Sequence, residues 1–378
     1  MSWQQIFLET FGTGGLGGMS LRTWLSCLHE NGYSVDSPYW LRAGVTTFSC
    51  LQNSIYRRVE GWRYADQIAA AQVQPPIFIL GLWRSGTTHL HNLLAQDQRF
   101  AFPNTYQVFF PHTFLSTESW NASLLELLLP SRRVQDNVKL GADQPQEDDF
   151  AVAGLTGMSF MMSLAFPRRA AEYSRYITFK NTTPGERQRW CDALEHFLKK
   201  LTVKYDRRLV LKSPSHTAHV AQLLSMYPHA KFVLIHRDPY EVFSSTMHCF
   251  AKVFNMWALQ RLGEYDILES TICNYREVTE KYFAERQLIP EQNLIEIAYT
   301  ELESAPIETL RNIYSSLELA SFQEVESTMR NYLDSLGEYR KNQHATIPFE
   351  LQCRLFDEWR SYFVNWGYAG DQAVRRAA

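Results

Sequence analysis

The residues best suited to chemistry lie in one short loop of glycine, arginine and hydroxyl side chains. The loop reads Gly81-Leu-Trp-Arg84-Ser85-Gly86-Thr87-Thr88. An apolar run at 77–80 precedes it, and the leucines that follow it have helical spacing. A strand, a tight loop and a helix N-terminus together direct backbone N–H groups and a positive helix end at one point. The pattern therefore predicts an anion-binding site, and phosphate is the usual occupant of such sites.

The spacing is that of G-x-x-x-x-G-K-[ST], the loop with which kinases and ATPases bind nucleoside triphosphates. Thr87 stands where that pattern has lysine, and the cationic side chain is instead Arg84, inside the loop. The missing lysine argues against nucleoside triphosphate chemistry but leaves a phosphate loop intact. An ordinary strand–turn–helix is the alternative interpretation.

A second anion-binding segment follows a later strand. Residues 231–236 form an apolar run, Arg237-Asp-Pro follows it, and Ser245 lies eight residues after Arg237 on a predicted helix. A guanidinium is always charged and binds phosphate through two parallel hydrogen bonds, and Ser245 would add a hydroxyl two helical turns along. A surface salt bridge is the alternative role for Arg237.

Two more polar side chains follow another predicted strand. The run 208–212 ends in Lys212, and Ser-Pro-Ser-His216 comes next, followed by a helix to residue 227. Strand, helix and strand make a βαβ unit, so we expect the strands at 208–212 and 231–236 to be parallel neighbours. Ligands of such sheets bind beyond the carboxyl ends of the strands. Arg84, Lys212, His216 and Arg237 all fall at those ends.

The fold class predicted is α/β, with a P-loop-type parallel sheet flanked by helices and an N-terminal helical extension. We expect the extension at 1–74, the α/β domain at 75–367 and a frayed tail at 368–378. Residues 39–71 predict one or two amphipathic helices with basic residues on the solvent face (Arg57, Arg58 and Arg63). Such helices either pack on the domain or make peripheral contact with a membrane surface or a lipid-like substrate. The uncharged run 150–167 predicts a buried helix or loop beside an apolar pocket rather than a membrane span.

Composition excludes several classes of protein. The formal net charge of −3 argues against a broad basic surface for nucleic acid. The six cysteines are scattered through the chain, which offers neither a metal knuckle nor a disulfide framework and fits a reducing compartment. The N-terminus has no basic region followed by an apolar core, so we expect no signal peptide and a cytoplasmic protein. No cluster has metal-ligand spacing, so no metal is expected.

At residues 75–95 the sequence resembles the superfamily of sulfotransferases that use 3′-phosphoadenosine 5′-phosphosulfate (PAPS). It is most similar to bacterial-type sulfotransferase family 3, whose loop often reads P-x-F-I-x-G-x-x-R-S-G-T-T-x-L-x-x-L-L. The segments around Arg237, Tyr299 and 339–344 resemble later elements of the same family. The resemblance implies in-line transfer of a sulfuryl group from PAPS, as co-substrate, to an acceptor hydroxyl or amine.

The resemblance also implies roles for individual residues. Ser85, Gly86, Thr87 and Thr88 would hold the 5′-phosphate, and Arg84 and Lys212 would contact the bridging and sulfate oxygens. Arg237 and Ser245 would hold the 3′-phosphate. The remaining binding candidates are an aromatic residue near the nucleotide, Tyr299, and a late basic loop containing Arg340, Lys341 and His344.

The catalytic base is a carboxylate or a histidine in our interpretation. Related enzymes often carry Glu where this sequence has Asn104 and Thr105. Glu147, at the start of the uncharged run, is the first candidate, because a carboxylate at a dry pocket mouth has a raised pKa. The alternative is that the acids at 147–149 only begin a helix. His216 is a further candidate, with His112 and His248 in reserve.

The acceptor predicted is a hydrophobic small molecule. Aromatic residues in 100–115 and the apolar run 150–166 favour a hydrophobic alcohol, lipid or polyketide-like compound over a polar glycan. Two alternatives for the whole protein stay open at this point. One is a P-loop kinase acting on a small molecule, and the other is a non-catalytic nucleotide-binding protein with the sulfotransferase fold.

Overall fold

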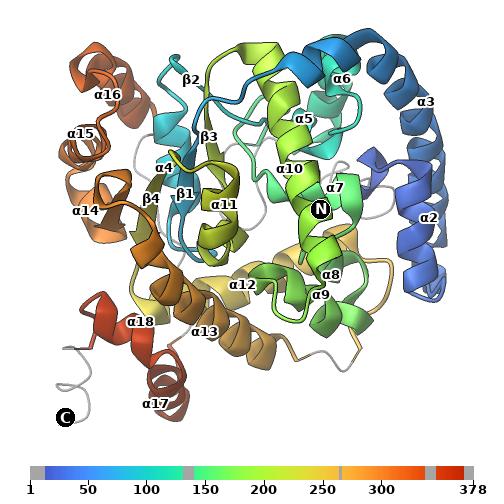
Figure 1. Ribbon diagram of the computed structural model, residues 1–378. Coiled ribbons are helices and arrows are strands. Elements are labelled where there is room, and N and C mark those ends of the chain that lie inside the picture. The colour runs from blue at the N-terminus through green and yellow to red at the C-terminus, as the bar shows by residue number, and fades with distance from the viewer. Residues whose placement is uncertain (1–12, 131–139, 264–265, 337–345, 370–378) are drawn as a thin grey trace. The chain divides into compact units, whose positions relative to one another are not determined.

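The computed structural model describes residues 13–130, 140–263, 266–336 and 346–369 (Figure 1). The chain divides into two compact units. The first combines residues 1–74 with 101–209 and 251–265, and the second combines 75–100 with 210–250 and 266–378. This grouping differs from the consecutive ranges expected from the sequence, because segments of the two units alternate along the chain.

A parallel β-sheet organises the second unit. In the described part of the chain it has five strands in the order β2-β3-β1-β4-β5. The strands are β1 (Ile77–Leu80), β2 (Phe100–Ala101), β3 (Arg208–Lys212), β4 (Lys231–His236) and β5 (Leu294–Ala298). β1 pairs in parallel with β3 and β4, and β4 pairs in parallel with β5. The predicted α/β fold with a parallel sheet is confirmed.

One expectation about the sheet was wrong. β3 and β4 are not neighbours, because β1 lies between them and pairs with both. The four residues of β1 are apolar and fully buried, which suits a strand that has a partner on each side and a covered layer above and below. The βαβ connection from β3 to β4 therefore passes over one intervening strand.

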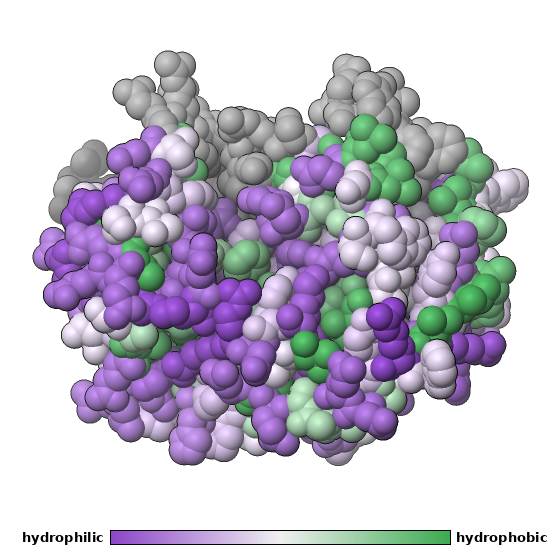
Figure 2. Space-filling view, turned by 90° about the horizontal axis from the view of Figure 1, so that it is seen from above, coloured by the Kyte–Doolittle hydropathy of each residue, from purple (hydrophilic) through white to green (hydrophobic). Residues whose placement is uncertain are grey.

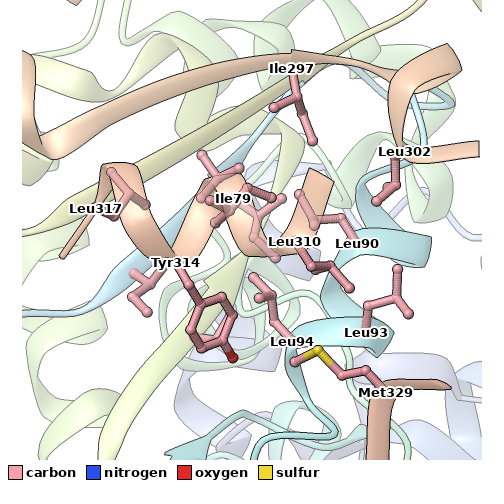
Figure 3. Packing of buried hydrophobic residues seen from close by; sticks show 14 of the residues in the cluster. Ile79, Leu90, Leu93, Leu94, Ile297, Leu302, Leu310, Tyr314, Leu317 and Met329 are labelled. Carbon is pink, nitrogen blue, oxygen red and sulfur yellow. The ribbon is translucent and has the colours of Figure 1, made fainter. Parts of the chain in front are cut away.

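Helices cover both faces of the sheet. On one face, alternate strand residues such as Ile79 and Ile297 pack against Leu90, Leu94 and Leu310 (Figure 3). The helices on this face are α4 (Thr87–Leu94), α14 (Tyr299–Ser304), α15 (Pro306–Ser316) and α16 (Glu326–Ser335). On the other face Phe78 stacks on Phe232, and its ring also meets the rings of His216 and Tyr227. The elements there are η4 (Pro214–Ala218), α11 (Val220–Met226) and α13 (Ile267–Glu285).

The second unit is completed by elements that follow the strands. α12 (Pro239–Trp257) begins three residues after β4 and runs on into the first unit at residue 251. Short 3-10 turns lie at η5 (Arg286–Leu288), η6 (Glu291–Asn293) and η7 (Phe322–Glu324). The last two helices are α17 (Phe349–Glu358) and α18 (Arg360–Asn365).

The first unit is largely helical. Its early elements are η1 (Gly14–Gly18), α2 (Leu21–Glu30), η2 (Ser37–Tyr39) and α3 (Trp40–Ala70). The later ones are α5 (Thr105–Phe109), α6 (Phe114–Leu128), α7 (Asp149–Thr156), α8 (Met162–Ala165), η3 (Pro167–Arg169), α9 (Ala170–Thr178) and α10 (Pro184–Tyr205). One of its cores joins Trp24 and Cys50 to Met162 and Phe166. The uncharged run 150–167 contains most of α7, a turn and α8 and is mostly buried, which agrees with the buried helix or loop expected. No described helix is long and apolar enough to cross a membrane.

Glycines with positive φ shape the turn between β1 and α4. Gly81 has φ +145° and Gly86, which caps α4, has φ +103°. A Cβ at Gly81 would lie 2.5 Å from the carbonyl oxygen of Ile235, and a Cβ at Gly86 would lie 2.3 Å from Cδ2 of Tyr299. Both positions therefore require glycine, for backbone conformation and for space.

Gly86→Ala should destabilise the protein by about 2 to 4 kcal/mol, because the new methyl group overlaps the Tyr299 ring and the residue must keep a positive φ. Urea unfolding of the wild type and the variant measures the difference. Gly61→Ala is the matched control, since Gly61 lies inside α3 with no atom within 4 Å of an added Cβ. The control should be neutral or stabilising by up to about 1 kcal/mol. Equal stability of the two variants would contradict this account of Gly86.

Candidate functional site

The turn between β1 and α4 is held by hydrogen bonds at both of its ends. Gly81 N–H donates to Thr217 Oγ1 at 2.8 Å. The backbone N–H and the hydroxyl of Ser85 both donate to the carbonyl oxygen of Leu82, at 3.1 and 2.8 Å. Because its two donors are used within the turn and its side chain is buried, Ser85 shapes the turn. The N–H groups of Gly86, Thr87 and Thr88 belong to the start of α4, where an α-helix has no carbonyl partners for its first donors.

Arg84 occupies an unusual backbone conformation. Its φ is +72°, in the left-handed region that disfavours residues with a Cβ. A single residue held there costs on the order of 1–3 kcal/mol and is commonly found at functional sites. Arg84 Nε donates to Ser245 Oγ at 3.1 Å. This hydrogen bond joins the turn after β1 to α12, so the two anion-binding segments predicted from the sequence lie together.

Lys212 brings a second cation to the same place. It is the last residue of β3, it pairs in register with Ile79 of β1, and it is only 1% exposed. Its Nζ lies 3.5 Å from Thr88 Oγ1 in the first turn of α4. A buried ammonium group next to a helix N-terminus makes a strongly positive environment, which favours an anion.

Arg237 and Tyr299 supply the next part of the site. The guanidinium of Arg237 lies over the Tyr299 ring, with Cζ 4.5 Å from the ring centroid. Its Nε and Nη2 each lie 2.7 Å from Oε2 of Glu241, in the first turn of α12. Since Tyr299 also faces Gly86, the ring connects Arg237 to the start of α4. The Arg237 guanidinium, which the sequence analysis predicts to bind the 3′-phosphate, is thus paired with the Glu241 carboxylate.

Three residues that the sequence analysis missed hold these side chains in place. Thr217 accepts the hydrogen bond from Gly81. Tyr275 bonds Thr246 Oγ1 at 2.7 Å and donates to the carbonyl oxygen of Trp83 at 3.3 Å, which ties α13 to α12 and to the turn. Tyr362 Oη accepts from the backbone N–H of Arg237 and donates to its carbonyl oxygen. No local sequence signal marks them, because their partners are more than a hundred residues away or on another helix.

His216 lies at the same sheet edge but is enclosed by the core. It is fully buried in η4, its ring meets Phe78 edge-on at 5.4 Å, and the His219 ring is 6.3 Å away. This packing favours a structural side chain. A catalytic role for His216 stays a prediction.

The three acids at the start of α7 have different environments in the first unit. Asp148 and Asp149 are buried, and Asp149 accepts a hydrogen bond from Ser159 Oγ at 2.7 Å. Glu147 is partly exposed, in the turn before the helix. Of the three it is therefore the carboxylate best able to meet a substrate. These acids belong to the first unit, whereas the cations Arg84 and Lys212 belong to the second.

Asn104 and His112 serve the fold or are buried, whereas the reserve candidate His248 is half-buried on α12. Asn104, where related enzymes often carry Glu, caps α5 by accepting from the Gln107 N–H at 2.9 Å. His112 is buried in the first unit, and burial together with the nearby cations Arg57 and Lys200 holds the pKa of its imidazole well below the usual value. An aromatic cluster of Phe109, Phe150 and Trp257 lies in the same unit, with ring centroids 5.2 to 6.1 Å apart.

The predicted late basic loop, with Arg340, Lys341 and His344, lies outside the described residues. Among the residues described, no group of three or more His, Cys, Asp or Glu side chains is placed to hold a metal ion. The donor set at the sheet edge consists of guanidinium and ammonium groups, hydroxyls and a helix N-terminus. These groups are the usual ligands of phosphate and sulfate, so the site fits a multiply charged anion.

Comparison with known proteins identifies the family. The family model described as "Sulfotransferase family" matches residues 75–324. The omega-hydroxy-beta-dihydromenaquinone-9 sulfotransferase Stf3 of Mycobacterium bovis is 31% identical over 355 residues, which are 93% of this chain and 90% of that protein. Its counterpart in Mycobacterium tuberculosis gives the same values. The chain therefore belongs to the sulfotransferase family and is a sulfotransferase.

Solved structures show the same fold at lower identity. The crystal structure of sulfotransferase STF9 from Mycobacterium avium has a TM-score of 0.66 and 20% identity, covering 92% of this chain and 97% of that one. Sulfotransferase STF1 from Mycobacterium tuberculosis has a TM-score of 0.64 and 16% identity, covering 90% and 91%. The resemblance drawn from the sequence is confirmed, and neither the kinase nor the non-catalytic alternative is favoured.

Proposed function

We propose that the protein transfers a sulfuryl group from PAPS to a hydroxyl of a hydrophobic, lipid-like acceptor. The observation that carries the proposal is the hydrogen bond from Arg84 to Ser245, which joins the two anion-binding segments at one sheet edge. Two such segments suit a donor with phosphate groups at both the 3′ and 5′ positions. The sulfotransferase family, as the sequence resemblance implies, takes its sulfate from that donor.

The second unit provides the groups that bind the donor. N–H groups of Gly86, Thr87 and Thr88, at the positive end of α4, hold the 5′-phosphate. Arg237 and Ser245 hold the 3′-phosphate, and the Tyr299 ring lies beside them. In binding, the phosphate displaces Glu241 from the Arg237 guanidinium. Arg340, Lys341 and His344 are further proposed ligands from the late basic loop.

Two cations stabilise the negative charge that develops during the transfer. When bound, PAPS supplies the sulfuryl group, whose bond to the 5′-phosphate breaks as a bond to the acceptor oxygen forms. Arg84 and Lys212 stabilise the negative charge that builds on the departing phosphate oxygen. The left-handed backbone at Arg84 and the burial of Lys212 fix both cations before the reaction, which is how electrostatic stabilisation becomes effective.

The first unit provides for the acceptor. Glu147 accepts the proton that the acceptor hydroxyl loses, and the aromatic cluster of Phe109, Phe150 and Trp257 contributes an apolar surface. Support for a hydrophobic acceptor comes from the Mycobacterium relatives, which are named for an omega-hydroxy derivative of dihydromenaquinone. A hydroxyl on an apolar molecule fits both the chemistry and the apolar character of this cluster.

Purified protein incubated with PAPS and a long-chain alcohol in detergent should form the sulfate ester, detected by mass spectrometry, with or without EDTA. Lys212→Ala should lower turnover by about a hundred- to a thousandfold, because it removes a preorganised charge. Lys231→Ala is the control, since Lys231 begins β4 at the opposite end of the strand. Activity that needs PAPS and disappears with EDTA, or equal turnover in the two variants, would contradict the mechanism.

Glu147→Gln should reduce turnover at least about a hundredfold, because a neutral amide cannot accept the proton. Binding of adenosine 3′,5′-bisphosphate, measured by calorimetry, should not change. The matched control is Asp143→Asn, which neutralises an exposed carboxylate in the same loop. Full turnover by Glu147→Gln would show that Glu147 is not the base. The histidines would then be the candidates, beginning with His216.

Glu241→Gln should tighten the binding of adenosine 3′,5′-bisphosphate about two- to fivefold. The substitution removes a carboxylate that competes for Arg237, and an ion pair whose carboxylate is exposed contributes up to about 1 kcal/mol. Glu269→Gln, which breaks the exposed pair with Arg354, serves as the control and should leave the affinity unchanged. Weaker binding by Glu241→Gln would show that Glu241 orients Arg237 rather than competing for it.

A further inference from the structure

Helix α3 buries four polar or charged side chains and exposes a row of large apolar ones. Arg42, Thr46, Asn53 and Glu60 are each less than 5% exposed. Arg42 Nη1 donates to the carbonyl oxygen of Ala258 at 2.7 Å, and Glu60 pairs with the buried Lys200 at 2.5 Å. These interactions fix which side of α3 faces the first unit. They reverse the usual arrangement, in which a surface helix buries its apolar stripe.

The outward face of α3 carries a continuous apolar stripe. Leu41, Phe48, Ile55 and Trp62 recur every seven residues, which is two helical turns, and Leu51 and Val59 fill the positions between them. All six side chains are between 47% and 89% exposed. From Leu41 to Trp62 the stripe extends about 32 Å at 1.5 Å per residue. Figure 2 shows green side chains gathered along the side of the molecule on which α3 lies in Figure 1.

Helix α6 extends the same surface within the first unit. Trp120, Leu124 and Leu127 are 54–62% exposed and share one face of α6. The Trp120 ring meets the Tyr56 ring of α3 edge-on, with centroids 6.0 Å apart. The two exposed stripes are therefore adjacent. Contiguous apolar surface of this extent is unusual for a monomer in water and marks an interaction site.

The charges beside the stripe have one predominant sign. Helical geometry places Arg58 and Arg63 on its two sides, and Arg57 is also exposed. The one exposed acidic residue of α3, Asp66, comes a turn after Trp62, where the stripe ends. A guanidinium on either side of a stripe rich in Trp, Phe and Leu is the pattern of a helix that lies in the plane of a membrane surface. The chain as a whole carries a net charge of −3, so this positive margin is a local feature.

We infer that the exposed faces of α3 and α6 form a docking surface for an anionic phospholipid membrane. The apolar stripe enters the boundary between headgroups and acyl chains, and Arg58 and Arg63 contact lipid phosphates. Trp62 and Trp120 suit this depth, because indole rings concentrate at the interface between lipid and water. The inference uses only the surface of the first unit and does not depend on the sulfotransfer assignment.

A membrane explains this surface better than a second copy of the chain. A symmetric pair through α3 would bring the arginines of one copy close to those of the other, because the exposed charged residues of α3 other than Asp66 are all arginines; the exposed acid of α6 is Glu126. An anionic bilayer provides both an apolar layer and the opposite charge.

Flotation with vesicles of phosphatidylcholine containing about 30% phosphatidylglycerol tests the inference. The full-length protein should float with these vesicles, and the double variant Ile55→Glu/Trp62→Glu should bind at least about tenfold more weakly. Arg58→Ala/Arg63→Ala should weaken binding to the anionic vesicles to the level measured with pure phosphatidylcholine, and should leave binding to pure phosphatidylcholine unchanged. The control is Leu288→Glu/Phe349→Glu, which places two charges at exposed apolar positions of the second unit.

Because the substituted side chains are exposed, the variants should keep the thermal stability of the wild type, and sulfation of a detergent-dispersed alcohol should not change. Wild-type protein that binds no vesicles overturns the inference, and so does equal binding by the Glu variant. A wild-type dimer in solution that Ile55→Glu/Trp62→Glu dissociates, with no vesicle binding, assigns the surface to a second copy instead. Light scattering measures the molar mass in solution and so distinguishes a monomer from a dimer.

Discussion

The parallel register around β1 is the constraint on which the candidate site depends. β1 pairs with β3 on one side and β4 on the other, and Ile79 is opposite both Lys212 and Val233. Because paired parallel strands run in the same direction, their carboxyl ends meet at one edge. Arg84 and Ser245 are 161 positions apart in the sequence, yet the edge brings them into hydrogen-bond contact. Backbone pairing in a buried sheet is more rigid than any loop, so cations carried just beyond it keep their positions without a ligand.

Gathering cations at one edge has an energetic cost that the local structure offsets. Lys212 is buried, Arg84 is held in a disfavoured backbone conformation, and Arg237 is kept in place by Glu241 and by the Tyr299 ring. Each of these arrangements is tolerable because neighbouring atoms satisfy the charge or fix the backbone. A phosphate or sulfate oxygen would stabilise the positive charge that these side chains bring to the edge. The arrangement of cations therefore suits a polyanion, which lowers the reorganisation that binding requires.

Local patterns in the sequence predicted the parts of the site that depend on local structure. The turn after β1, the strand ends at Lys212 and Arg237, and the start of α12 were all recognisable, because hydrophobic periodicity and glycine positions report on a few consecutive residues. Strand order was not recognisable from adjacency alone, since the partner of β3 comes from more than a hundred residues earlier. Tyr275 and Tyr362 were missed for the same reason.

The amphipathic character of α3 was predictable, but periodicity defines two faces without saying which one is buried. The burial of Glu60 against Lys200 decides that, and only the packed structure contains it.

The division of the chain into two compact units suits the two kinds of substrate in the proposed reaction. A nucleotide with several phosphates needs fixed cations and backbone donors, and the second unit carries them on a sheet edge. A hydrophobic alcohol needs apolar contact area and a base, and the first unit carries aromatic clusters and Glu147. An apolar lining would desolvate the phosphates, whereas exposed cations would keep an acceptor pocket wet, so one local environment cannot serve both. The exposed stripe of α3 belongs to the unit with the apolar groups. A lipid-like acceptor and a membrane would therefore both contact the first unit. Substitutions in that unit would change the acceptor without changing the donor site in the second unit.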